Sequence, residues 1–404
     1  MTVTAADVVR ARSAVQTVAR RTPMLSTRTF SERAGGKVLL KAENLQRTGS
    51  FKVRGVAAKL DALGDANCAQ GVVAASAGNH GQALAAAARE RGVHSEVFVP
   101  ADTPMAKVEA AREMGATVHI GGASVDACLE AAKERAERGG LAFVHPFDDP
   151  AIVAGQGSLG LELLEDVEDL AQVLVPVGGG GLCAGVALAI KDARPDTRIV
   201  GVQAAACAPF PESMRTGTAV EAASALTIAD GIAVKRPGGI TLPLLRELVD
   251  EMVVVEEDET AEAMALLLER CKLVVEGAGA VGVAALLAGK VRGTETGSTV
   301  AILSGGNVDA GLLAAIARRH ETERGRRMVM LTRVADRPGN LATLLATVAA
   351  TGANIVDVAH VREGLDLHVR ETAVELVLET RGHEHAERVM AMLREDGYSP
   401  QVLR

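Results

Sequence analysis

Short apolar runs alternate with longer, alanine-rich stretches over residues 36–310. The run GVVAAS (71–76) precedes GNHGQALAAAARERG (78–92), and AQVLVPVGGGG (171–181) precedes LCAGVALAIKDA (182–193). The runs are apolar throughout, which is typical of strands buried on both faces, and the alanine-rich stretches have helical spacing. This alternation predicts an α/β fold with an open, mostly parallel sheet covered by helices on both faces.

The alternation stops at a densely charged segment, RRHETERGRRM (318–328), where we expect a domain boundary. Beyond it the pattern predicts a strand, a helix, two strands, a helix and a last strand. That β-α-β-β-α-β order is the ferredoxin-like motif. The six elements are expected in the stretches 327–339, 340–352, 354–363, 371–381, 383–397 and 399–404.

Composition and charge narrow the class of protein. Hydrophobic residues make up 48% of the 404 residues but aromatic residues only 2%, so Ala, Val, Leu and Ile are expected to build the cores. The net charge of −8 and the lack of a basic block argue against a nucleic-acid or anionic-membrane partner. The five cysteines include no Cys-x-x-Cys pair, which argues against a disulfide framework or a zinc site. No apolar run reaches the length of a membrane span, and the amino-terminal helix capped by Thr4 is too charged for a signal peptide, so we expect a soluble, cytoplasmic protein.

The strongest local signal is the run Gly178, Gly179, Gly180 and Gly181 before Leu182, between a buried strand and a helix. Glycines let backbone N–H groups approach an anion closely, and the helix that follows turns its positive end toward it. The pattern therefore favours a phosphate site over a plain turn. The loop lacks the Gly-Lys-Ser/Thr of a nucleoside-triphosphate P-loop.

Two further stretches match the dinucleotide-binding fingerprint, GQGSLG (155–160) and GAGAVG (277–282). The first lacks the acidic residue expected about 20 residues later, because the next strand runs into the four glycines. The second follows ALLLERCKLVVE (265–276), whose spacing is helical. We expect both to be packing turns, with a nicotinamide dehydrogenase as the alternative.

Several polar residues stand at strand ends or helix starts. Lys52 lies in NLQRTGSFKVRG (44–55), Asn79 and His80 in SAGNHGQ, and Ser304 in LSGGN. Each alone fits a surface charge, a helix start or a cap. Together with the glycine loop, they are expected to meet where an open α/β sheet binds its ligand. That ligand needs a phosphate, an amine-reactive carbon and a ring, which pyridoxal phosphate provides, since a desolvated lysine amine can form a Schiff base with it.

Eight motifs in order resemble the fold-type II pyridoxal-phosphate enzymes, and among them the threonine dehydratase family. They are KAENLQRTGSFKVRG, SAGNHGQ, HPFDD, GQGSLGLE, PVGGGGL, TIADGI, VVEGAGAVG and LSGGN. The resemblance covers residues 5–320 and implies a two-lobed catalytic domain over 1–320, with the smaller lobe near 50–150. It implies deamination of threonine to 2-oxobutanoate and ammonia, with serine as a lesser substrate. The tail, over 326–404, resembles an ACT domain, a module that senses amino acids.

The resemblance implies roles for single residues. Lys52 matches the Schiff-base lysine, which then acts as the base on the substrate α-carbon, and Phe51 matches the residue packed on the cofactor ring. Asn79 matches the amide bound to the phenolic oxygen. Ser304 matches the group facing the pyridine nitrogen, where a neutral hydroxyl makes the ring a weaker electron sink. The glycine loop with Leu182 matches the phosphate site. The site for the substrate carboxylate is implied at Ser76, Gly78, Asn79 and His80.

Two positions bear on which reaction this is. Where the similar serine racemases carry a serine and an asparagine, this chain has Ala77 and Phe147, which favours dehydration. Racemases of this kind bind a divalent cation through acids after the strand that here reads IVGVQAAACAPF, but no acid follows until Glu212, so we expect no metal. A serine- or hydroxyaspartate-specific dehydratase, a racemase and a non-catalytic amino-acid sensor stay as alternatives, because one methyl group is worth only ~1–3 kcal/mol of discrimination.

The ACT resemblance implies a branched-chain amino-acid effector, isoleucine or valine, held across an interface of a homodimer or homotetramer. Helix starts suit the effector's carboxylate. A pure assembly role for the tail is the alternative. The implied effector residues are Arg337, Pro338, Gly339, Asn340, Asn354 and Ile355.

Overall fold

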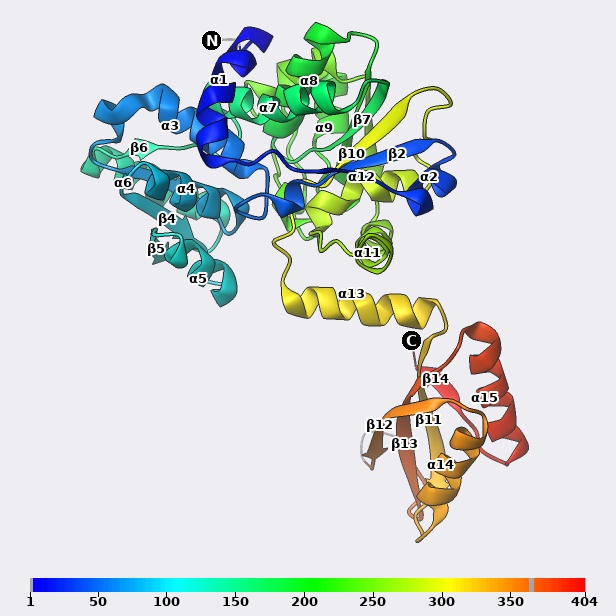
Figure 1. The fold of residues 1–404 in the computed structure, drawn as a ribbon. Coiled ribbons are helices and arrows are strands. Elements are labelled where there is room, and N and C mark those ends of the chain that lie inside the picture. The colour runs from blue at the N-terminus through cyan, green and yellow to red at the C-terminus, as the bar shows by residue number, and fades with distance from the viewer. Residues whose placement is uncertain (1–2, 363–366, 404) are drawn as a thin grey trace. The chain divides into compact units, whose positions relative to one another are not determined.

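The computed structural model describes residues 3–362 and 367–403 (Figure 1). The chain divides into two compact units, Met1–Val308 and Asp309–Arg404. Among the described residues, no helix is both long enough and apolar enough to cross a membrane.

The division between the units falls ahead of the charged segment 318–328. A helix, α13 (Ala310–Glu323), runs through much of that segment. Asp309 starts this helix, because its side chain accepts from the amides of Gly311 and Leu312. Residues 318–323 of the charged segment therefore belong to a helix, and Arg327 already begins the next strand.

The first unit contains two separate sheets (Figure 1). Their strands are β1 (Met24–Ser26), β2 (Lys37–Lys41), β3 (Val72–Ala75), β4 (Ser95–Val99), β5 (Thr117–Ile120), β6 (Ala142–Phe143), β7 (Leu170–Pro176), β8 (Arg198–Ala204), β9 (Glu251–Val255) and β10 (Ser298–Ile302). The larger sheet has the order β1-β2-β10-β7-β8-β9, and only its β1–β2 pair is antiparallel. The smaller sheet, β5-β4-β3-β6, is parallel throughout. The predicted mostly parallel α/β class is confirmed.

Helices connect these strands in sequence. They are α1 (Ala5–Val18), α2 (Arg28–Ala34), α3 (Lys52–Cys68), α4 (Asn79–Glu90), α5 (Met105–Glu113), α6 (Val125–Gly139), α7 (Pro150–Asp166), α8 (Gly181–Ala193), α9 (Phe210–Thr216), α10 (Thr241–Leu248), α11 (Glu257–Leu266) and α12 (Gly277–Leu287). Short 3-10 turns stand at η1 (Glu43–Leu45), η2 (Ala205–Cys207) and η3 (Asp230–Ile232), and a π-helical turn, η4 (Leu267–Cys271), follows α11.

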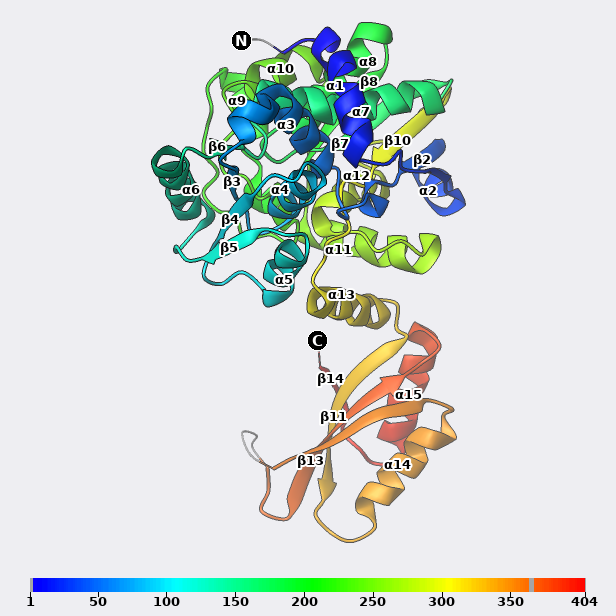
Figure 2. The same cartoon turned by 60° about the vertical axis from the view of Figure 1, so that its left-hand side comes forward.

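The smaller sheet is covered on both faces, as strand alternation requires. Val72 and Ala74 of β3 belong to the core shared with α3 and α4, whereas Val73 and Ala75 belong to the core shared with α6. Figure 2 shows α4 and α6 on opposite sides of this sheet.

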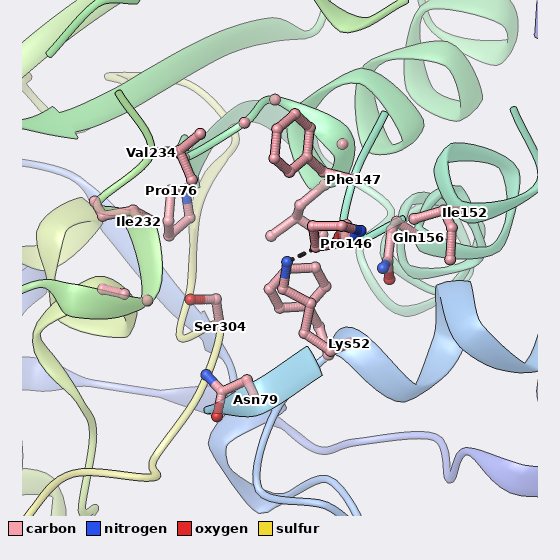
Figure 3. Close-up of a pocket in the computed structure, with 18 of the residues that line it drawn as sticks. Lys52, Asn79, Pro146, Phe147, Ile152, Gln156, Pro176, Ile232, Val234 and Ser304 are labelled. Atoms are coloured by element: carbon pink, nitrogen blue, oxygen red, sulfur yellow. Dashed lines mark hydrogen bonds between the residues drawn. The ribbon is translucent and has the colours of Figure 1, made fainter. Parts of the chain in front are cut away.

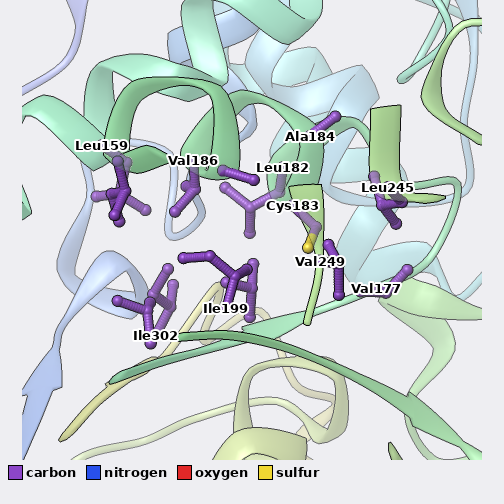
Figure 4. Close-up of a cluster of buried hydrophobic side chains, with 14 of the residues drawn as sticks. Leu159, Val177, Leu182, Cys183, Ala184, Val186, Ile199, Leu245, Val249 and Ile302 are labelled. Atoms are coloured by element: carbon purple, nitrogen blue, oxygen red, sulfur yellow. The ribbon is translucent and has the colours of Figure 1, made fainter. Parts of the chain in front are cut away.

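The core beside the larger sheet is almost entirely aliphatic. Leu159, Val186, Ile199 and Ile302 pack together between helices α7 and α8 and the strands (Figure 4). All four side chains are fully buried, so the low aromatic content is compensated by many branched side chains.

The prediction of packing turns in the two glycine-rich stretches is wrong. Residues 155–160 lie inside α7, and residues 277–282 begin α12. Their glycines allow close packing: a Cβ on Gly157 of α7 would lie 2.8 Å from the carbonyl oxygen of Gly185 in α8, and a Cβ on Gly277 would lie 2.4 Å from the carbonyl oxygen of Ile228. Close packing thus outweighs the low helix propensity of glycine.

The second unit contains the predicted β-α-β-β-α-β series. Its elements after α13 are β11 (Arg327–Ala335), α14 (Asn340–Ala350), β12 (Asn354–Val361), β13 (Glu371–Glu379), α15 (His383–Glu395) and β14 (Gln401–Leu403). The sheet order is β12-β13-β11-β14 with antiparallel pairs, an ACT-like arrangement. Met330, Leu344 and Leu393 form its core with Tyr398 packed against them. The expected strands 354–363 and 399–404 each reach one residue outside the described part of the chain.

Candidate functional site

A pocket of about 520 Å³, measured with its mouth, lies in the first unit (Figure 3). This volume suits a small cofactor with a substrate, since ligand sites span ~300–1,000 Å³. The starts of α3 and α4 and the segments after β7 and β10 contribute to it. Its lining residues are Phe51, Lys52, Asn79, Pro146, Phe147, Ile152, Gln156, Pro176, Gly178, Gly179, Gly180, Gly181, Leu182, Gly231, Ile232, Val234, Glu276, Ala278 and Ser304.

Lys52 is the first residue of α3, and its Nζ donates to the carbonyl oxygen of Pro146 at 3.1 Å (Figure 3). The Nζ also lies 5.3 Å from the centroid of the Phe51 ring. Exclusion of water lowers the pKa of Lys52 to about 8, although the nearby Glu276 carboxyl opposes this shift. An uncharged amine is therefore more accessible than on a surface lysine, and the uncharged form is the nucleophile.

The glycine loop lies between β7 and α8 as a set of free donors. The amides of residues 178–183 have no acceptor among the described residues. Gly180 has a φ of +94°, and a Cβ on Gly179 would lie 2.4 Å from the ring of Phe147. The loop therefore has no room for side chains at these two positions. Its unpaired backbone N–H groups, together with the start of α8, suit a phosphate group.

A second layer of hydrogen bonds holds this loop. The buried Thr241 hydroxyl donates to the carbonyl oxygen of Gly179 at 2.6 Å. Asp148, from the HPFDD motif, accepts from the amides of Gly239 and Ile240 at 2.9 and 2.8 Å. The loop is therefore supported from the 238–241 segment.

Asn79 and Ser304 also face the pocket (Figure 3). The Asn79 Nδ2 donates to Glu276 Oε1 at 2.8 Å, and its Oδ1 accepts from Asn307 Nδ2 at 2.7 Å. Ser304 follows β10, and its carbonyl oxygen accepts from the amide of Phe51 at 3.1 Å. The structure thus brings Lys52, Asn79, Ser304 and the glycine loop into one pocket.

At the corner between β3 and α4, Asn79 lines the pocket, whereas Ser76, Gly78 and His80 do not. Ser76 Oγ accepts from the amide of Gly78 at 3.1 Å, which shapes the turn. The His80 ring is buried, its Nε2 lies 3.0 Å from the carbonyl oxygen of Val144, and it does not line the pocket. Burial, followed by the charge of Lys52, lowers the pKa of His80 to about 3, so the ring is neutral. A carboxylate bound at this corner would face the backbone N–H groups at the start of α4.

A buried ionic network fixes α3 just behind the pocket lysine. Arg54 is 1% exposed and contacts Glu43 through two nitrogens, Nε and Nη2, each at 2.8 Å. Its Nη1 reaches Glu162 of α7 at 2.7 Å, and the buried Lys41 reaches the same carboxyl at 2.7 Å. Only Val53 separates Arg54 from Lys52, so this network anchors the first turn of α3, which carries the pocket lysine.

Sequence reasoning missed four polar residues that form or support the pocket. Glu276 and Gln156 stand inside motifs that were read only as glycine patterns, Asn307 ends the LSGGN motif from which only Ser304 was selected, and Thr241 lies outside every motif. Glu276 could have been suspected as an acidic residue directly before a glycine-rich helix start.

The predicted effector residues form two groups at opposite ends of the tail sheet. Arg337, Pro338, Gly339 and Asn340 follow the end of β11. Asn354 and Ile355 begin β12. Asn354 is paired with Glu379 of β13, which on its other side is paired with Arg327 at the start of β11. The 11-residue helix α14 separates the groups, a length of about 16 Å. One chain therefore does not bring them together.

The parallel sheets, the glycine loop and the pocket lysine define a class of enzyme with a pyridoxal-phosphate site. The chain belongs to the family of pyridoxal-phosphate-dependent enzymes, whose family model, "Pyridoxal-phosphate dependent enzyme", matches residues 15–306. The residues present fit this cofactor, because the loop offers unpaired amides to its phosphate and Lys52 offers an amine to its aldehyde.

Comparison with individual proteins of this family gives more specific information about function. It is 46% identical over 385 residues to an L-threonine ammonia-lyase from Geobacter sulfurreducens, covering 95% of this chain and 96% of that one. It is 42% identical over 402 residues to an L-threonine ammonia-lyase from Thermotoga maritima, covering 99% and 100%. Among solved structures, a maize serine racemase superposes with a TM-score of 0.75 at 33% identity, covering 80% of this chain and 100% of that one.

Proposed function

We propose that this protein is an L-threonine ammonia-lyase, which converts L-threonine to 2-oxobutanoate and ammonia and accepts L-serine more slowly. The observation that carries the proposal is the single pocket that joins Lys52 to the glycine loop. The likeness to two L-threonine ammonia-lyases over nearly the whole chain supports the choice of substrate.

The roles of this chain's residues follow from their positions. Bound pyridoxal phosphate supplies a carbon that joins the substrate amine and a ring that accepts electrons when the α-proton leaves. The Lys52 amine takes that α-proton, and the start of α4, with residues 76–80, holds the substrate carboxylate. The β-hydroxyl leaves as water, and one water is added back as ammonia departs, so the net products are the 2-oxo acid and ammonia.

The first prediction is a substrate profile. L-Threonine should give 2-oxobutanoate, and L-serine should give pyruvate at a lower kcat/KM, because the pocket wall offers apolar contacts such as Ile232 and Val234 to a β-methyl group. The measurement is 2-oxo acid formation together with chiral chromatography of the remaining amino acid. D-Serine appearing faster than pyruvate would support the racemase alternative instead.

We also propose that the tail binds a branched-chain amino acid between two copies of the chain. Residues 337–340 of one copy and residues 354–355 of another can share a ligand, which one copy cannot arrange alone. Gly339 opens α14 with a φ of +92°, and the helix start suits the ligand's carboxylate. Such a site requires at least a homodimer.

The second prediction follows from the shared site. Isoleucine or valine should bind the full chain in calorimetry and change its threonine turnover, and Gly339→Val and Asn354→Ala should each abolish that binding. When the two variants are mixed and exchange subunits, about a quarter of the sites should recover, because half the dimers are mixed and each contains one intact site. No recovery after demonstrated exchange would place the site within one copy. If both variants bind isoleucine or valine as tightly as the wild type does, the proposed site is wrong and the tail is an assembly unit.

A further inference from the structure

Glu276 is a buried carboxyl group in the pocket that no step above uses. It is 4% exposed, precedes α12 and lines the pocket. Two glycines leave room for its side chain: a Cβ on Gly305 would lie 2.3 Å from Glu276 Oε1, and a Cβ on Gly231 would lie 3.2 Å from it. The fold thus makes a specific place for this acid.

The contacts of Glu276 define one orientation of the Asn79 amide. One Nδ2–H of Asn79 donates to Glu276 Oε1 at 2.8 Å, and Asn79 Oδ1 accepts from Asn307 at 2.7 Å. Asn307 is itself held, since its Nδ2 also donates to the carbonyl oxygen of Thr48 at 2.9 Å. A flipped amide would place oxygen against the carboxyl oxygen and N–H against N–H. The second N–H of Asn79 is therefore left for a ligand.

We propose that Glu276 is a positioning residue of the cofactor site, which through its contact with Asn79 aims the second N–H of that amide at the phenolic oxygen of bound pyridoxal phosphate. The proposal deepens the proposed function and rests on the contact with the phenolic oxygen that the family resemblance implies for Asn79. It concerns cofactor binding alone, so it can be tested without any amino-acid substrate.

The charges around Glu276 make this contact sensitive to pH. Burial and then the carboxylate of Asp230 raise the pKa of Glu276, and the Asn79 contact and the ammonium groups of Lys107 and Lys52 oppose them, so that the pKa is about 7. The carboxyl is therefore neutral below this pKa and negative above it. Because Asn79 transmits the change to the phenolic oxygen, the visible absorbance of the bound cofactor should change between about pH 6 and 8.

The test compares Glu276→Gln with Glu276→Ala in the holoenzyme. Glutamine keeps an acceptor oxygen for Asn79 but does not titrate, so cofactor affinity should stay within about threefold while the absorbance change near pH 7 disappears. Alanine removes the acceptor, and cofactor affinity should fall about tenfold, as expected for loss of a charge-assisted hydrogen bond. Affinity is measured by equilibrium dialysis and absorbance by titration, with thermal unfolding as the check on folding.

Asp230→Asn is the matched control, since it keeps the Asn79–Glu276 contact and removes a charge that raises the pKa of Glu276. Its absorbance change should move to lower pH. The proposal is overturned if Glu276→Gln keeps the absorbance change, or if Glu276→Ala binds the cofactor as tightly as the wild type. If both Glu276 variants fail to fold, the Asp230→Asn variant is sufficient: the proposal is overturned if its absorbance change occurs at the same pH as in the wild type.

Discussion

Lys52→Ala should lower threonine turnover by about 10³-fold or more, because it removes the amine that we propose both bonds the cofactor and takes the α-proton. Lys52→Arg should be equally inactive, since a guanidinium keeps the positive charge but does not give up its proton at neutral pH. The measurement is steady-state 2-oxobutanoate formation by each variant loaded with cofactor. Lys133→Ala is the matched control, as this lysine lies on the exposed side of α6 and pairs with Glu130.

The same residue can be identified chemically. Borohydride reduction of the holoenzyme should fix the cofactor on the peptide that contains Lys52, because this amine lines the pocket that holds the glycine loop. A label on any other lysine, or wild-type turnover by Lys52→Ala, would contradict the assignment.

Arg54→Ala should lower the free energy of unfolding of the catalytic unit by about 3–5 kcal/mol, the usual consequence of removing one partner from a buried ion pair. The reason is that Glu43, which is fully buried, loses its ion-pair partner and retains the hydrogen bond from Thr22. Burial, the largest single effect, raises the pKa of Glu43, but the charge and hydrogen bonds of Arg54, with smaller effects of Thr22 and Lys41, together leave that pKa below its ordinary value. The measurement is urea unfolding followed by circular dichroism.

Two further variants separate the ion pair from general damage. Arg28→Ala removes an exposed arginine paired with Glu32 four residues away, and should leave stability unchanged within error. Arg54→Met combined with Glu43→Gln should recover part of the loss, because the orphaned charge is gone. If the double variant is less stable than Arg54→Ala, the unpaired carboxylate is not the cause.

The sequence allowed prediction of features whose cause is local. Continuous apolar runs marked the parallel strands, because this pattern depends on neighbouring residues. The four adjacent glycines and Lys52 were selected from the stretches around them, and both line the pocket, although their proposed roles stay predictions. These predictions needed no knowledge of distant contacts.

Features built from distant residues could not be predicted in this way. Glu276 gains its place in the pocket from Asn79, 197 positions away, and from room made by Gly305. Residues 155–160 look like a turn because glycine disfavours helix, yet contact with neighbouring helices makes glycine necessary there. Asn340 and Asn354 are close in sequence, but one helix places them at opposite ends of a sheet.

The position of Tyr398 has a spectroscopic consequence. The protein has no tryptophan and a single tyrosine, and that tyrosine packs against the core of the ACT-like unit. Tyrosine fluorescence therefore originates in this unit alone, whereas visible absorbance from pyridoxal phosphate originates in the other. Each unit has its own natural chromophore, so a titration with isoleucine or urea can follow the two units at two wavelengths in one cuvette, without a label.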